Sequence, residues 1–140
     1  MAFHEKSAWI MATGLLFGAF VYAGAVRALS VDLGTLAPPT LAPLIGFAVL
    51  LVLIAVVGHI AIAVMNPSEA ESSLDERETR VVQRAGYWSS YVLATGIVLS
   101  LGSYLIVVNG EWLFYGVFGS LVLASFADYA LQVVFFRTAL

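Results

Sequence analysis

The sequence contains no cysteine. This absence excludes disulfide frameworks, zinc–thiolate sites, Cys-ligated iron–sulfur clusters and c-type haem attachment, although it carries no information about the redox compartment. Charged residues are also scarce, at 11% of the chain, which is less than half of the roughly 25% found in an ordinary soluble domain. The formal charge of the chain is −3, whereas a nucleic-acid-binding face carries an excess of basic residues. We therefore expect no nucleic-acid partner.

Apolar residues are abundant instead. They make up 61% of the 140 residues, and the mean hydropathy is +0.98. A soluble protein of this size keeps much of its surface in contact with water and has too little interior to hide so much apolar surface. The composition therefore excludes an ordinary soluble enzyme and a disordered chain. It predicts an integral membrane protein whose first partner is the lipid bilayer.

Four segments reach the roughly 20 apolar residues that a membrane-spanning helix needs. These segments are far longer than a strand of about 5–6 residues, and they lack the apolar/polar alternation of a membrane barrel. We therefore predict an all-α, polytopic membrane protein with one domain. The predicted spans cover residues 8–29, 41–65, 87–108 and 112–136, and residues 66–86 form the longest loop.

The first span shares features with a cleaved signal peptide. Lys6 precedes an apolar stretch, and Ala23-Gly24-Ala25 resembles a small-residue cleavage site. The apolar run continues past that site, however, so we expect the segment to be retained as a helix.

Basic residues are distributed unevenly between the two predicted sides of the membrane. An even number of spans puts both termini on the same side as the 66–86 loop. The positive-inside rule then predicts a multi-pass protein with both termini in the cytoplasm. The cytoplasmic side holds Lys6, Arg77, Arg80, Arg84 and Arg137, and the other side holds only Arg27.

The loops constrain the third helix at both ends. The link Asn109-Gly110-Glu111 is so short that the third and fourth spans must be antiparallel neighbours. At the other end, Ser73 and Glu76 have the spacing of a capping box. We therefore expect the third helix to begin near Ser73 and to extend roughly 20 Å into the cytoplasm before it reaches the membrane.

This cytoplasmic extension carries the candidate residues for docking a partner. Glu76 and Arg80 stand at positions i and i+4 in the order that favours an ion pair. One interpretation is a solvated, salt-bridged helix, and the other is a docking surface for a cytoplasmic protein. The candidate docking residues are Asp75, Glu76, Arg77, Arg80 and Arg84.

Two ionisable residues lie deep in the predicted spans. His59 and Asp128 are roughly 9 and 12 Å from the cytoplasmic ends of their spans. An ionised carboxylate there needs a partner, and a His59–Asp128 pair would stabilise both charged forms. The candidate polar cluster comprises His59, Asp128, Tyr91, Thr95 and Gln132. It is interpreted as a structural pair, as two separately satisfied residues, as a proton- or ion-responsive site, or as a ligand or metal site.

Small residues recur at four-residue spacing in three of the spans. There are three such pairs: Gly14 and Gly18, Gly96 and Ser100, and Gly116 and Ser120. Helices associate in lipid through close packing at small residues, so these pairs predict helix–helix contacts. The other interpretation is that they line a path through the membrane.

The two halves of the chain also resemble each other. Ala12-Thr13-Gly14 in the first span matches Ala94-Thr95-Gly96 in the third, and an alignment of the second and fourth spans sets His59 opposite Asp128. This pattern suggests two hairpins related by a parallel internal repeat.

Motifs of known chemistry are missing. The chain has no nucleophile triad, no H-E-x-x-H and no phosphate-binding loop. One histidine and one aspartate are fewer ligands than a metal normally needs. We therefore predict no catalytic residue, no metal and no cofactor.

The chain resembles small four-span bacterial inner-membrane proteins of unknown function, through its four spans and through the loop motif Leu74-Asp75-Glu76-Arg77-Glu78. This resemblance implies the bacterial inner membrane and a soluble regulatory partner. The small multidrug exporters are similar in size, but they carry an essential glutamate in their first span, whereas residues 8–29 contain no acid.

These observations favour a non-enzymatic binding or regulatory protein that docks a cytoplasmic partner and self-associates. The alternative is a small transporter or channel in which Asp128 carries a proton or cation with His59 as its partner. A third possibility is a membrane-embedded enzyme or a lipid- or quinone-binding protein in which His59 acts on a bound head group.

Overall fold

The computed structural model describes residues 3–65, 67 and 75–138. The four helices in this part of the chain are all long and apolar enough to cross a membrane. This confirms the predicted all-α polytopic fold. The second span has the predicted bounds, whereas the first, third and fourth helices are longer than the spans predicted within them. The helices are α1 (Phe3–Leu33), α2 (Leu41–Met65), α4 (Glu76–Val107) and α5 (Gly110–Thr138).

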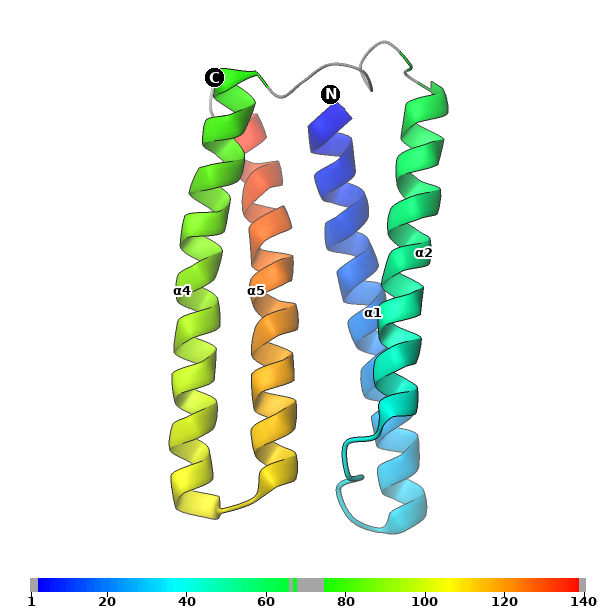
Figure 1. Ribbon diagram of the computed structural model, residues 1–140, viewed down its shortest axis with the longest axis vertical. Helices are drawn as coiled ribbons and strands as arrows, with labels where there is room; N and C mark the ends of the chain where they lie inside the picture. Colours follow the sequence, from blue (N-terminus) through cyan, green and yellow to red (C-terminus); the bar gives the residue numbers. More distant parts are fainter. Residues whose placement is uncertain (1–2, 66, 68–74, 139–140) are drawn as a thin grey trace.

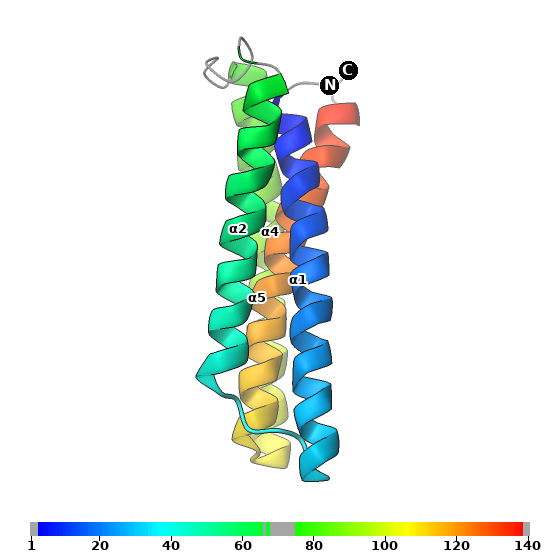
Figure 2. The ribbon, with the colours of Figure 1, turned by 90° about the vertical axis from the view of Figure 1, so that its right-hand side faces the viewer.

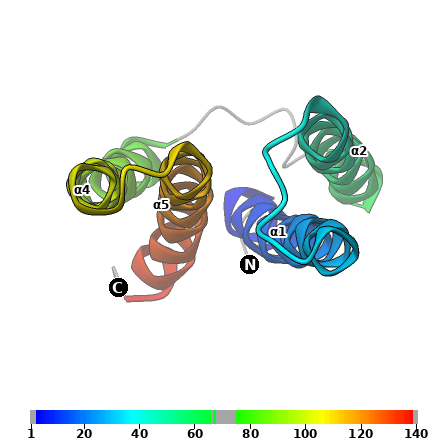
Figure 3. The ribbon, with the colours of Figure 1, turned by 90° about the horizontal axis from the view of Figure 1, so that it is seen from below.

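The four helices lie side by side in the order α4, α5, α1, α2 (Figure 1). Seen along the helix axes they form an open row with α2 and α4 at its two edges (Figure 3). Helix α5 contacts both α4 and α1, and α1 also contacts α2. The fold therefore consists of two hairpins joined through α1 and α5. Because α4 and α5 are antiparallel neighbours, the prediction from their short link is confirmed.

The two ends of the molecule differ in what they carry. We call the end at which α1 begins and α5 ends the terminal end, and the opposite end the turn end (Figure 2). The 32 residues of α4 make it about 48 Å long at about 1.5 Å per residue, compared with roughly 30 Å for the hydrocarbon core of a bilayer. The excess matches the charged first turns of α4, so we expect these turns to lie beyond the core at the terminal end.

The first turn of α4 begins two residues later than the predicted capping box. Asp75 is the N-cap and Glu78 is the third helical residue, and the two form a capping box. The Asp75 carboxylate accepts from the Glu76 N–H at 2.7 Å, and Glu78 accepts from the Asp75 N–H at 3.3 Å. The prediction that gave Glu76 the reciprocal role was therefore wrong, and Ser73 lies outside the described residues. A charged cap suits the positive end of the helix dipole, which explains why the aspartate takes this role.

The interface between α4 and α5 is built from small residues that face each other. A Cβ added to Gly96 would collide with the side chain of Ser120, and one added to Gly116 would lie 2.6 Å from the Ser100 hydroxyl. Each serine donates its hydroxyl back to the carbonyl four residues earlier in its own helix, at 2.7 Å. The small residues therefore pack the two helices together, as predicted.

The interface between α1 and α2 uses glycines against branched and aromatic side chains. A Cβ on Gly14 would lie 2.7 Å from Ile54, and one on Gly18 would lie 3.1 Å from Phe47. Phe47 also packs edge-on against Phe118 of α5, with 5.3 Å between ring centroids, and Tyr22 contacts both rings. This aromatic group joins α1, α2 and α5.

Candidate functional site

His59 is held entirely within the α1–α2 hairpin. Its Nδ1 lies 2.6 Å from the Ala55 carbonyl oxygen and its Nε2 lies 2.7 Å from the Ser7 hydroxyl. A carbonyl oxygen only accepts, so Nδ1 carries a proton and donates it. In the neutral ring Nε2 then accepts from Ser7. Both ring nitrogens are thereby satisfied, and Ser7 is a polar partner that the sequence did not predict.

Asp128 lies in the other hairpin, on α5 beside Gly86 of α4. A Cβ added to Gly86 would lie 4.0 Å from the Asp128 Oδ1 atom. That oxygen is buried and has no hydrogen-bond partner among the described residues. His59 and Asp128 therefore do not form the pair that was one of the interpretations of the sequence. The two residues have similar depths, but His59 faces Ser7 of α1, whereas Asp128 faces Gly86 of α4.

The remaining members of the predicted polar cluster are dispersed as well. The Tyr91 hydroxyl is 2.8 Å from the Tyr87 hydroxyl on the exposed side of α4, and Trp88 packs against the same ring. Thr95 is exposed, whereas Gln132 is buried on α5. The five residues do not form one site.

This separation predicts that changes at His59 and Asp128 act independently. Residues that share no partner give nearly additive effects, within about 0.5 kcal/mol. We therefore expect the free-energy change of the double variant His59→Ala/Asp128→Ala to equal the sum of the two single changes. Reversible unfolding of the purified protein in detergent measures all three values. A coupling energy above about 1 kcal/mol would show that the two side chains interact.

The five candidate docking residues at the terminal end make two kinds of contact. Asp75 caps α4, and the Glu76 carboxylate lies 4.0 Å from Arg80 with both side chains exposed. The arginines instead share a groove with the end of α5, in which the Arg84 guanidinium lies 4.9 Å from the centre of the Phe135 ring. We call this the arginine groove. It has a volume of about 390 Å³ and is lined by Arg77, Arg80, Val81, Arg84, Phe135 and Thr138.

The arginine groove continues toward the middle of the molecule. A second cavity of about 400 Å³ shares Arg84 and Phe135 with it and adds Trp88, Val92 and Leu131. The lining of both cavities contains arginines and apolar side chains but no acidic residue. The predicted docking residues are thus divided, because the three arginines gather in one groove while Asp75 and Glu76 make local contacts of the helix start.

An ion pair at the terminal end joins the two ends of the chain. The Arg137 guanidinium donates from Nε to Glu5 at 3.0 Å and lies over the Trp9 ring, 5.6 Å from its centre. Glu5 is buried at 8% exposure. No local sequence pattern indicates this pair, because Glu5 and Arg137 lie at opposite ends of the chain. The available signal was topological, because an even number of spans brings the beginning of α1 and the end of α5 to the same side.

The described residues contain no group of three histidine, aspartate or glutamate side chains placed to hold a metal ion. Comparison with protein-family models, curated proteins and solved structures finds no match for this chain.

Proposed function

We propose that this chain is a non-enzymatic membrane protein with a regulatory role, and that it binds an acidic segment of a cytoplasmic protein in the arginine groove. The observation that carries the proposal is the gathering of Arg77, Arg80 and Arg84 on one face of α4 around Phe135. Arginine suits such a role because its planar guanidinium binds carboxylates in a bidentate manner. The neighbouring phenylalanine provides apolar contact for the same partner.

The position of the arginine groove along α4 favours a soluble protein, and not the lipid surface, as its partner. Tyr87 and Trp88 have the amphipathic rings that favour a membrane interface. Arg77 precedes Tyr87 by ten residues along α4, which corresponds to about 15 Å at about 1.5 Å per residue. The outer part of the groove therefore lies in the water beyond the interface, where a soluble protein reaches it.

The orientation and location belong to the same proposal. The terminal end carries five of the six lysine and arginine residues, and Arg27 alone lies toward the turn end. The positive-inside rule then assigns the terminal end to the cytoplasm. The resemblance to small four-span bacterial proteins supports the bacterial inner membrane.

A photo-reactive residue at Thr138 tests the docking in cells. Thr138 is exposed and lines the arginine groove, so this label leaves the arginines intact. We expect an adduct with one polypeptide, and we expect the variant with Arg77, Arg80 and Arg84 changed to glutamate to reduce it about tenfold or more, because charge reversal repels an acidic partner. Changing the same three residues to lysine keeps the charge and should retain most of the adduct.

A label at Val108, exposed at the turn end, is the positional control and should give no such adduct. A polypeptide adduct at Thr138 that persists in the glutamate variant would contradict the proposal. An adduct with lipid alone would assign the groove to the membrane surface instead.

The transporter alternative has less support from the geometry. A carrier residue must be reached by the ion or proton that it moves, whereas the Asp128 Oδ1 atom is buried in the contact between α4 and α5. Asp128 also lines neither of the two cavities at the terminal end. His59 is not available as its partner because both of its ring nitrogens are bonded elsewhere.

A further inference from the structure

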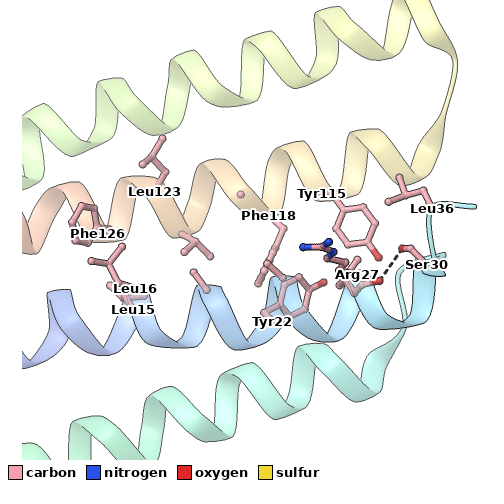
Figure 4. Close-up of a pocket in the computed structure, with 15 residues that line it drawn as sticks. Leu15, Leu16, Tyr22, Arg27, Ser30, Leu36, Tyr115, Phe118, Leu123 and Phe126 are labelled. Carbon is pink, nitrogen blue, oxygen red and sulfur yellow. Dashed lines mark hydrogen bonds between the residues drawn. The ribbon is translucent and has the colours of Figure 1, made fainter. Parts of the chain in front are cut away.

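A groove runs between α1 and α5 over the half of the molecule nearest the turn end (Figure 4). Its volume is about 610 Å³, which lies within the range of about 300–1,000 Å³ found for small-molecule sites. Its walls are mostly aliphatic and aromatic side chains of the two helices. We call it the turn-end groove. It extends along α1 from Leu15 to Ser30 and along α5 from Tyr115 to Phe126.

The length of the turn-end groove matches one leaflet of a membrane. Leu16 and Arg27 both line it, and the helix rises about 16 Å between them at about 1.5 Å per residue. Half of a roughly 30 Å hydrocarbon core is about 15 Å. An acyl chain that lies along the helices therefore fits the groove with its polar end at the level of Arg27.

Arg27 supplies the only positive charge in the turn half of the chain, since the other lysines and arginines belong to the terminal end. Figure 4 shows its guanidinium extending from α1 toward α5, beside Tyr115. The side chain is exposed, and it makes no hydrogen bond or ion pair with any other described residue. Its donors are therefore free for a ligand.

The hydroxyl groups of Tyr115 and Ser30, at the same end of the groove as Arg27, are already engaged. Tyr115 donates its hydroxyl to the Ala37 carbonyl at 2.9 Å. The Ser30 hydroxyl donates to the Val26 carbonyl at 2.8 Å and accepts from the Ala37 N–H at 2.9 Å. These bonds hold the α1–α2 loop against α5 at the end of the groove. The Arg27 guanidinium is the one charged group in the lining of the groove, and its positive charge favours an anion.

We propose that the turn-end groove binds a phospholipid of net negative charge, with one acyl chain between α1 and α5 and its phosphate against Arg27. The apolar walls and the length suit the chain, and the single unpaired cation suits the phosphate, which guanidinium binds through charge-assisted hydrogen bonds. This site lies at the opposite end from the arginine groove, so it is independent of the docking function.

Native mass spectrometry of the full chain in detergent tests the proposal with three probes: phosphatidylglycerol, phosphatidylcholine with the same acyl chains, and palmitate. We expect one phosphatidylglycerol to bind about tenfold more tightly than phosphatidylcholine, the effect of one charge-assisted contact. Arg27→Gln should remove this preference by weakening phosphatidylglycerol binding about tenfold. Equal binding of the two phospholipids to the unmodified protein, or an Arg27→Gln variant that keeps the preference, would overturn the proposal.

Gly119 offers a way to fill the groove without touching the charge. It lines the groove, and a Cβ built on it meets no atom within 4 Å. Gly119→Leu should therefore fold normally and weaken both phospholipids. Gly102 on α4 has equally open space, so Gly102→Leu is the matched control and should bind both phospholipids as the unmodified protein does.

Three further results would overturn the assignment. Phospholipid binding that survives Gly119→Leu would locate the lipid elsewhere on the protein. Tighter binding of palmitate than of phosphatidylglycerol would assign the groove to a free fatty acid. A dimer that Gly119→Leu dissociates would assign the groove to a second copy of the chain.

Discussion

Replacing Gly96 with alanine is expected to lower the free energy of unfolding by about 1–3 kcal/mol, the usual cost of adding a methyl group to a packed interior. The added Cβ would meet both the hydroxyl and the Cβ of Ser120, and the Ser120 Cα is 3.4 Å away. A Cβ is not the end of a flexible side chain, so α4 and α5 must separate to accept the change. Thermal or denaturant unfolding in detergent, followed by circular dichroism, measures the loss.

Two variants distinguish this collision from a general effect of alanine. Gly102 lies on the same helix with no atom within 4 Å of its added Cβ, so Gly102→Ala should gain up to about 1 kcal/mol from helix propensity. Ser120→Gly should restore much of the stability lost in Gly96→Ala, because it removes the atoms that collide. Equal effects of Gly96→Ala and Gly102→Ala would contradict the close contact between α4 and α5.

Much of the fold is predictable because lipid leaves the backbone few choices. Each polar backbone group must be satisfied inside the membrane, so a long apolar segment becomes a helix. The second span, residues 41–65, has the highest hydropathy of the four described helices, and its predicted bounds match those of α2. Close packing of small residues likewise identified Gly96 and Gly116 as contact points. Hydropathy does not predict the order in which the helices lie side by side. No local pattern in the sequence indicates that α1 packs against α5.

The failure of the predicted polar cluster has the same origin. Counting residues from the span ends gives the depth of His59 and Asp128 but not their lateral positions. The internal match did contain a clue. Gly14 and Gly96 occupy matching positions, and each faces the second helix of its own hairpin. His59 and Asp128 also match, and each faces the first helix of its own hairpin, at Ser7 and Gly86 respectively. Equivalent positions in two hairpins lie in separate interfaces.

Among the charged residues, too, contacts between sequence neighbours are predictable, whereas contacts between different helices are not. Asp75 and Glu78 form a capping box between residues that are close in the sequence. Their spacing is the same as that of Ser73 and Glu76, two residues earlier, so the sequence contains the signal for both. The arginine groove needs Phe135 from α5, and the turn-end groove needs Tyr115 and Phe118 from α5 opposite α1. The sequence accordingly shows Arg27 only as the one basic residue of its side, although the structure places it in the lining of the turn-end groove.

Removing Arg137 is expected to have the second large effect on stability. Its partner Glu5 has a side chain that is only 11% exposed, whereas Arg137 itself is 58% exposed. Breaking a fully buried pair costs about 3–5 kcal/mol because it leaves a buried charge unpaired, and an exposed pair is worth about 0–1 kcal/mol. With one partner buried, we expect Arg137→Leu to cost about 1–3 kcal/mol, including the contact of the guanidinium with Trp9.

The pair at Arg80 and Glu76 provides the matched control. Its atoms are 4.0 Å apart, and the side chains are 77% and 93% exposed, so Arg80→Leu should change the free energy of unfolding by less than about 0.5 kcal/mol. Adding Glu5→Gln to Arg137→Leu removes the unpaired carboxylate and should recover part of the loss, while Glu76→Gln added to Arg80→Leu should recover nothing. If the two arginine variants lose equal stability, Glu5 and Arg137 do not hold the ends of α1 and α5 together. If Arg137→Leu alone is costly and Glu5→Gln relieves it, the ion pair closes the terminal end through the charge of a buried carboxylate.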